Sequence, residues 1–377
     1  MKRHTEIVIV GGGIAGASLA YFLARGGATD VILLEREAQA GHHATGRSAA
    51  MLAELDSVPT LLELKTASAG FFREPPASFS DQPILTRSGL LVPLRGDWWR
   101  ALVDMADTLA AHGLTIEQWS ADDLRRVVPL LDAERFEGAA FLPEDGRIDV
   151  HELLSSYLRH AKRAGILTEY HTTVRAIVRE GERCVGVRTD AGEVRARWVV
   201  NAAGAWASEI GQLAAASSIA LVPHRRTIAI FDPPSDVDVR SWPFVSCEQD
   251  GVYFAPESGS MLVCPMDETP VSAHDASPEE QAIAEAFERL GMVAPRLVPR
   301  SVRRSWAGLR TFAPDRVPVI GEDPRRPGFF WLAGQGGCGI ETSPIVGAVA
   351  ADLLLTGRSD RFAAERLAPA RFSAGVQ

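Results

Sequence analysis

The stretch of sequence that decides the fold lies close to the N-terminus and reads Ile7-Val8-Ile9-Val10-Gly11-Gly12-Gly13-Ile14-Ala15-Gly16. An apolar pattern with helical spacing follows through Ala24, and a second apolar run at residues 31–34 ends at Glu35. This order of strand, glycine turn, helix, strand and acid is the fingerprint of a dinucleotide-binding βαβ unit. A coincidental glycine-rich turn is the alternative, and the complete set of flanking elements argues against it.

Each part of this unit has a physical role in holding a dinucleotide. Gly11 allows a sharp turn out of the strand, Gly13 lets the pyrophosphate approach the backbone, and Gly16 allows close packing of helix and sheet. The helix N-terminus offers free N–H groups and a partial positive charge to the phosphates. Glu35 is placed to accept hydrogen bonds from the adenosine ribose. The predicted contacts of this unit are Gly11, Gly13, Ile14, Ala15, Gly16, Glu35 and Arg36.

The same region raises the alternative of a membrane or secretion signal, because residues 7–24 carry no charged side chain. Four glycines within residues 11–16 would make a poor bilayer helix, and no small-residue cleavage site follows. We therefore expect a soluble, cytoplasmic protein without a transmembrane segment.

Composition narrows the classes of function. A chain of 377 residues is expected to form two domains, and a formal net charge of −9 argues against a nucleic-acid partner. The four cysteines are widely spaced and form no CxxC pair, which is typical of a reducing compartment rather than a disulfide framework or a zinc site. His42 and His43 are adjacent and cannot face one metal ion from a helix, so no metal site is predicted.

Turn and capping residues predict the remaining elements. A helical stretch reaches Phe72, residues 83–95 read as strand, and residues 98–112 read as a helix. Asp149 is a predicted N-cap, and its helix ends at Gly165. A three-stranded meander is predicted at residues 174–179, 184–189 and 194–197, and it leads into a buried strand at 198–204. A capping box at Ser277–Glu280 predicts a helix that Gly291 closes, and strand-rich sequence fills residues 222–266.

The C-terminal part contains a second residue pattern that is typical of a nucleotide site. A buried strand at residues 329–333 is followed by a glycine-rich loop at 334–339, and a helix runs from Ser343 to about Leu355. Glycines between a buried strand and a capped helix favour close approach of a ligand to the backbone over a merely flexible loop.

Together these features resemble the glutathione-reductase-type FAD fold, and specifically the D-amino-acid oxidase and glycine oxidase superfamily. Three further motifs carry the resemblance, namely Asn201-Ala202-Ala203-Gly204-Ala205-Trp206, Asp315-Arg316-Val317-Pro318-Val319-Ile320-Gly321 and Thr45-Gly46-Arg47-Ser48-Ala49-Ala50. Within the superfamily the sequence is most similar to the bacterial FAD-dependent D-arginine dehydrogenases. The resemblance implies non-covalent FAD and further cofactor contacts from Thr45, Arg47, Ser48, Ala49, Ala50, Val174, Ala203, Gly204, Trp206, Gly308, Gly336, Gly337, Gly339 and Ile340.

The implied fold is α/β. It combines a discontinuous Rossmann-like FAD-binding domain with a substrate-binding domain that is α+β and built on an antiparallel sheet. The FAD-binding domain is expected at residues 1–82, 146–221 and 307–377, and the substrate-binding domain at 83–145 and 222–306.

The implied substrate site centres on a carboxylate clamp. Arg226 and Arg310 match the family's clamp, since a guanidinium fork binds a carboxylate through two parallel hydrogen bonds. Tyr253 matches a tyrosine that covers the substrate, while a place in the core is its alternative. Glu341 either faces the substrate ammonium or caps the following helix, where the helix dipole is expected to keep it ionised. Arg47 is expected to contact the cofactor through its loop, with a helix-end pairing as the alternative.

The pocket for the substrate side chain departs from the D-arginine dehydrogenases. Met51 stands where they carry a histidine, Asp56 replaces a tyrosine, and a loose alignment puts Leu90 in place of an acidic residue. Glu341 replaces a glutamine beside the flavin. A cationic substrate such as D-arginine is therefore not expected.

The sequence thus predicts an FAD-dependent amino acid or amine oxidoreductase. It would oxidise the Cα–N bond of a small or neutral (D-)amino acid by hydride transfer to flavin N5, and the imine product would hydrolyse. A secondary-amine oxidase acting on an N-substituted glycine is the first alternative, and a hydroxy-acid oxidase is the next. A non-catalytic flavin-binding redox module is the alternative from another class. Either oxygen or a quinone is expected as the electron acceptor.

Overall fold

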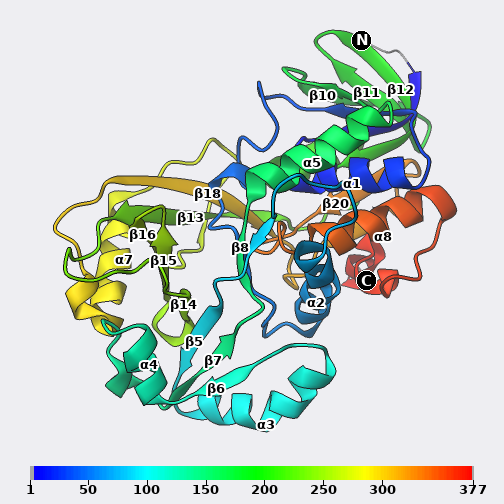
Figure 1. Cartoon of the computed structure of the whole chain (residues 1–377). Coiled ribbons are helices and arrows are strands. Elements are labelled where there is room, and N and C mark those ends of the chain that lie inside the picture. Colours follow the sequence, from blue (N-terminus) through cyan, green and yellow to red (C-terminus); the bar gives the residue numbers. More distant parts are fainter. Residues whose placement is uncertain (1–3, 376–377) are drawn as a thin grey trace.

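The computed structural model describes residues 4–375, so residues 1–3 and 376–377 of the predicted FAD-binding ranges lie outside the described residues. Two large sheets dominate the fold, and a small third sheet lies beside them (Figure 1). The predicted α/β class is confirmed.

The first sheet has eight strands and contains the N-terminal fingerprint. Strand β1 (His4–Val10) runs parallel to β2 (Val31–Leu34) on one side and to β12 (Gly192–Asn201) on the other. The remaining strands are β9 (Leu167–Glu169), β10 (Val174–Glu180), β11 (Arg183–Thr189), β19 (Val319–Glu322) and β20 (Phe329–Ala333).

Helices cover this sheet, which is why its central strands are continuous apolar runs. Ile7 and Ile9 pack in one core cluster with α1 (Ile14–Arg25) and α8 (Ser343–Thr356), while Val8 and Val10 pack in the cluster on the opposite face. Helix α5 (Val150–Arg163) packs against α1, and α6 (Ala207–Ala214) lies on the opposite face. The Asp149 cap is confirmed, because Glu152 N donates to Asp149 Oδ1 at 2.9 Å.

In the register of the parallel strands, three neighbouring strands end at the same edge of the sheet. Val10 pairs with Leu34 and with Asn201, so Gly11, Glu35 and Ala202 leave the sheet side by side. Ligands of open α/β sheets bind at such a carboxyl edge.

The second sheet has nine strands and is mainly antiparallel. Its strands are β5 (Leu90–Leu94), β6 (Glu117–Trp119), β7 (Gly138–Leu142), β13 (Val222–Phe231), β14 (Phe244–Cys247), β15 (Val252–Glu257), β16 (Ser260–Cys264), β17 (Thr269–Pro270) and β18 (Arg304–Phe312). One face packs on α4 (Ala121–Val127) and α7 (Glu280–Val293), and the other turns toward α3 (Asp97–Ala111).

A three-stranded sheet of β3 (Met51–Leu52), β4 (Leu85–Thr86) and β8 (Gly146–Ile148) lies between the large sheets in Figure 1. Helix α2 (Pro59–Arg73) follows β3 and packs against α8. No helix within residues 4–375 is long and apolar enough to cross a membrane.

Two sequence predictions are corrected by these elements. The third meander strand and the predicted strand at 198–204 are one strand, β12, because its residues continue straight from the antiparallel meander into the parallel sheet. Helix α7 begins at Glu280 without a side-chain cap and continues past Gly291, so the predicted capping box is wrong. The predicted domain boundary between residues 306 and 307 falls inside β18, which pairs with β13 along its whole length.

Candidate active site

Two cavities adjoin the carboxyl edge of the first sheet, and the predicted site residues divide between them. The first cavity, of about 210 Å³, is lined by Gly11, Gly13, Glu35, Arg36, Thr45, Arg47, Val174, Ala203, Gly204, Trp206 and Gly308 among others. The second, of about 1010 Å³, is lined by Ser48, Ala49, Ala50, Met51, Arg226, Tyr253, Arg310, Gly336, Gly337, Ile340 and Glu341 among others. Ile14, Ala15, Gly16 and Gly339 line neither cavity.

The glycine turn fits a dinucleotide for steric reasons visible in the structure. Gly11 has φ of +113°, and a Cβ there would lie 2.4 Å from the carbonyl oxygen of Ala202. A Cβ at Gly16 would lie 2.0 Å from the carbonyl oxygen of Gly11, so Gly16 acts by packing rather than by touching a ligand. Gly13 lines the cavity at the start of α1, where backbone N–H groups attract phosphate.

The acid at the end of β2 is held in place by the backbone. Glu35 Oε2 accepts a hydrogen bond from Gly12 N at 2.7 Å, and Oε1 accepts one from Glu37 N at 2.8 Å. Each carboxylate oxygen keeps a free lone pair for a ribose hydroxyl. Beside it, the Arg36 guanidinium stacks over the Trp206 ring with 3.6 Å to the centroid. These contacts are consistent with the adenosine end of a dinucleotide site.

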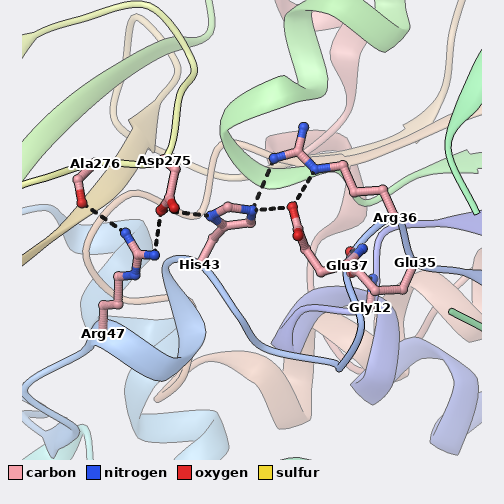
Figure 2. A network of polar contacts seen from close by, with 8 residues as sticks. All are labelled: Gly12, Glu35, Arg36, Glu37, His43, Arg47, Asp275 and Ala276. Carbon is pink, nitrogen blue, oxygen red and sulfur yellow. Dashed lines mark hydrogen bonds and ion pairs between the residues drawn. The ribbon is translucent and has the colours of Figure 1, made fainter. Parts of the chain in front are cut away.

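A polar network that includes lining residues of this cavity joins two distant segments of the chain (Figure 2). Arg47 donates to the carbonyl oxygen of Ala276 at 2.9 Å and forms an ion pair with Asp275. His43 Nδ1 lies 3.8 Å from Asp275, and its Nε2 lies 2.8 Å from Glu37. The loop at residues 41–48 is thereby tied to the segment at residues 271–276. Arg47 therefore bonds another part of the protein, and neither the predicted role nor its alternative described this contact.

One group of side chains in this network has the spacing of metal ligands. Ligand atoms of Glu37, His42 and His43 lie within 4.8 Å of one another. The adjacency of His42 and His43 argues against a shared metal ion only on a helix, whereas these residues lie in a turn. The Arg36 guanidinium lies 2.9 Å from His43 Nε2, and this positive charge favours an ionic network over a bound cation.

The second cavity is bounded by one face of the nine-stranded sheet. Arg226 on β13 pairs with Gly308 on β18, and His224 pairs with Arg310, so both arginines project from the same face. Tyr253 on β15 packs in the core cluster on that face. Arg225 points to the opposite face and is paired with Glu279. Strand alternation thus brings the three predicted substrate contacts together.

The side chains of this trio retain unused hydrogen-bonding capacity. Arg226 is 5% exposed and donates to Glu268 Oε1 at 2.8 Å, while its Nε and Nη1 are buried without a partner. The Tyr253 hydroxyl is also buried without a hydrogen-bond partner, and burial raises its pKa. Arg310 has no hydrogen-bond or ion-pair partner among residues 4–375. Unsatisfied buried donors cost about 1–3 kcal/mol each, so this arrangement is suited to an anionic ligand.

Glu341 lines the second cavity, and of its two predicted roles only the cap of α8 is contradicted. Its Oε2 accepts from Ala53 N at 2.8 Å, and its Oε1 lies 3.2 Å from Lys65 Nζ. Lys65 also contacts Asp56 Oδ2 at 2.8 Å, so one buried ammonium serves two carboxylates. Burial raises the pKa of Glu341, and the Lys65 charge opposes that rise. Glu341 makes no cap bond to α8, and the expected control by the helix dipole is replaced by Lys65.

Lys65 is the main residue that the sequence analysis missed. It lies on the buried face of α2 and is 6% exposed, although the other buried residues of that face are apolar or small. A lysine within such a face is the only sequence signal that pointed to it, because nothing in the sequence indicates its two partners.

The glycine loop before α8 completes the second cavity. A Cβ at Gly337 would lie 2.6 Å from Arg310 Nη1, so this glycine leaves room for the arginine. Gly339 instead approaches Gln335 and Ile14. The Cys338 thiol donates to the carbonyl oxygen of Gln335 at 3.1 Å, and burial raises its pKa to about 12. This thiol is therefore protonated at neutral pH.

The chain is similar to several known proteins over most of its length. Hydrogen cyanide synthase subunit HcnC of Pseudomonas aeruginosa is 26% identical over 391 residues, covering 93% of this chain and 92% of that protein. Glycine oxidase of Geobacillus kaustophilus is 26% identical over 367 residues, covering 94% of each. The crystal structure of L-proline dehydrogenase from P. horikoshii superposes with a TM-score of 0.89 at 24% identity, covering 100% of this chain and 99% of that one.

The family assignment follows from a match that spans most of the chain. The model described as "FAD dependent oxidoreductase" (DAO) matches residues 6–353, which include both cavities. The chain therefore belongs to the DAO family of FAD-dependent oxidoreductases, within the glycine oxidase superfamily, and FAD is its cofactor.

Proposed function

We propose that this enzyme oxidises the Cα–N bond of a neutral (D-)amino acid whose carboxylate binds to Arg226 and Arg310. The observation that carries the proposal is the set of buried donors without partners on one face of the second cavity. These are Nε and Nη1 of Arg226 and the hydroxyl of Tyr253, with the unpaired guanidinium of Arg310 beside them. A carboxylate satisfies such donors through charge-assisted hydrogen bonds.

We propose that the two cavities hold different parts of the cofactor. Gly13, Glu35 and the Arg36–Trp206 pair would hold the adenosine and pyrophosphate, and the loop at residues 48–51 with Gly336 and Gly337 would hold the flavin ring. When bound, the flavin accepts the hydride from the substrate. The protein's part would be to anchor the carboxylate and to orient Cα–H toward the flavin.

We propose that the cofactor is bound without a covalent link. Cys338 is the cysteine that lines the second cavity, and its thiol is protonated and hydrogen-bonded to a backbone carbonyl. We expect acid or heat to release intact FAD into the supernatant. Flavin that stays with the precipitated protein would contradict this proposal.

The proposed substrate carries no cationic side chain. Met51 and Leu90 line the cavity as apolar groups, and Asp56 and Glu341 are both engaged by Lys65. A distal ammonium or guanidinium beside these four residues would therefore find no free carboxylate, and burying a charge without a partner is costly.

A secondary amine such as sarcosine or iminodiacetate is the second candidate, because it presents the same carboxylate to the same arginines. A non-catalytic flavin module has no need of a carboxylate anchor. Oxygen and a quinone both stay open as electron acceptors.

The deciding experiment mixes the FAD-loaded enzyme anaerobically with single amino acids and amines while the flavin absorbance is followed. We expect D-alanine or a larger neutral amino acid to bleach the flavin faster than D-arginine, D-lysine, sarcosine or iminodiacetate. Fastest bleaching by sarcosine or iminodiacetate would establish the second candidate. A faster reaction with D-arginine or D-lysine would overturn the neutral-substrate proposal, and no bleaching by any compound would favour the non-catalytic module.

A further inference from the structure

The lining of the second cavity changes from charged to apolar along the face of the nine-stranded sheet. The strand order from the arginine-bearing β13 is β16, β15, β14 and then β5. Tyr253 lies on β15, and Phe244 packs against it on β14 with ring centroids 5.0 Å apart. The face therefore begins with two arginines, passes a tyrosine and a phenylalanine, and ends on β5.

The β5 end of the cavity is apolar because of strand alternation. Leu90, Val92 and Leu94 line the cavity, whereas Leu91 packs in the core cluster on the opposite face of the sheet. Helix α3 closes this end with Leu102 and Leu109, which belong to the same cluster as Leu90.

The α3 end of the cavity also reaches the surface. Trp98 and Met105 line the cavity and are 54% and 48% exposed. The polar lining groups here are Asp97, which pairs with Arg100, His112, which contacts the carbonyl oxygen of Thr108, and Glu248, which accepts a hydrogen bond from Ser246. The apolar contact at this end comes from the leucines and Val92 of β5 and α3.

The extent of this apolar end exceeds what a short amino acid can fill. Four strand steps separate β13 from β5, which at about 4.8 Å per step is about 19 Å across the sheet. The whole cavity of about 1010 Å³ also accommodates the flavin ring, yet glycine or alanine anchored at Arg226 would leave the β5 and α3 residues without contact.

We infer that the substrate is an α-amino acid with a large apolar side chain, which extends from the arginine pair along Leu90, Val92 and Leu94 to the inner face of α3. This inference rests on the proposed function, since it takes the carboxylate to be bound at Arg226 and Arg310. It makes β5 and α3 the determinants of specificity.

Straight-chain carboxylates test the inference without requiring turnover. Titration of the FAD-loaded enzyme with acetate, butanoate, hexanoate and octanoate, followed by the flavin spectrum, gives a Kd for each. Each buried methylene contributes about 0.8 kcal/mol, so Kd should fall by about fourfold per added CH2. The kcat/KM values of alanine, norvaline, norleucine and phenylalanine, in the reactive enantiomer, should rise in parallel.

Two substitutions on one helix locate the effect. Met105→Glu places a charge in the cavity lining and should lower kcat/KM for norleucine at least tenfold, with alanine little changed. Val103→Glu is the matched control, because Val103 is 42% exposed on the same helix and does not line the cavity. The control should behave as the unmodified enzyme.

Different results would overturn the inference about the side chain and the proposed function. A Kd and kcat/KM that do not improve with chain length, or a Met105→Glu enzyme that treats norleucine normally, would overturn the inference while carboxylate binding stands. Absence of a spectral response to every carboxylate would overturn the arginine anchor, and with it the proposed function.

Discussion

Arg310 is the residue whose removal best separates binding of substrate from binding of cofactor. It lines the second cavity and has no partner within residues 4–375, so Arg310→Leu should not disturb the fold. We expect KM to rise by the equivalent of about 2–5 kcal/mol, the range for loss of one member of a buried charge pair, while FAD stays bound. Arg304→Leu, on the exposed start of β18, is the control. An unchanged KM would remove Arg310 from the site.

Lys65 is expected to be essential for stability because two carboxylates depend on its charge. Lys65→Met should lower the unfolding free energy at pH 7 by about 3–5 kcal/mol, the cost of breaking a buried pair. Burial raises the pKa of Glu341. Without Lys65 it would rise further, so this variant should regain stability as the pH falls. Chemical denaturation at several pH values measures this, and adding Glu341→Gln should restore much of the loss.

At the scale of elements, the turn between β1 and α1 contains two glycines with different tasks. Gly16→Ala places a Cβ against the Gly11 carbonyl at 2.0 Å and should prevent α1 from packing, which circular dichroism and yield would report. Gly13→Ala meets Thr45 Oγ1 at an ordinary 3.4 Å, so the apoprotein should fold and bind FAD more weakly. Equal FAD affinity in Gly13→Ala and the unmodified protein would argue against pyrophosphate binding at this turn.

Asp145, in the turn between β7 and β8, and Glu54, just after β3, form a buried acid pair that makes stability depend on pH. Glu54 N donates to Asp145 Oδ2 at 3.1 Å, and Arg73 pairs with Glu54. Burial and the nearby Glu54 raise the pKa of Asp145 to about 8. The folded state therefore binds more protons than the unfolded chain, and stability should fall as the pH rises from about 4 to about 8.

Asp145→Asn tests this pH dependence because an amide oxygen can still accept from Glu54 N. The variant should have a higher Tm than the unmodified protein at pH 8 and a smaller difference at pH 5. Asp190→Asn, at an exposed pair with Arg175, is the control and should leave the pH profile unchanged. A parallel profile for Asp145→Asn would contradict the assignment.

At the scale of the whole molecule, the network of Figure 2 ties a loop of the cofactor site to a segment after β17. His274 and Ala276 of that segment line the first cavity, so the segment would lie beside the bound cofactor. Asp275→Ala should remove the ion pair with Arg47 and accelerate FAD release several-fold, measured by fluorescence recovery on dilution. Asp236→Ala, at a surface pair with Arg296, should leave release unchanged.

Much of this molecule could be predicted where the physical cause is local in sequence. The fingerprint predicted β1, α1 and β2, and Asp149 predicted the start of α5, because turn geometry and capping depend on neighbouring residues. The predicted start of α7 was wrong, since the helix begins at Glu280 with Glu279 as its N-cap and without a side-chain cap. Lys65 and the Arg47–Asp275 contact could not be predicted, since their partners lie far along the chain and depend on how the sheets are placed.

Strand β18 contributes Gly308 to the first cavity and Arg310 to the second. Two residues of a strand span about 6.6 Å, and nine consecutive pairs with β13 fix that strand in register. The strand thus fixes the distance between the proposed cofactor site and the proposed carboxylate anchor. Substitutions in β5 and α3 could therefore change which substrate side chain fits the cavity. They would leave the distance between Gly308 and Arg310 unchanged. Insertions or deletions in β18 should abolish activity whatever the substrate.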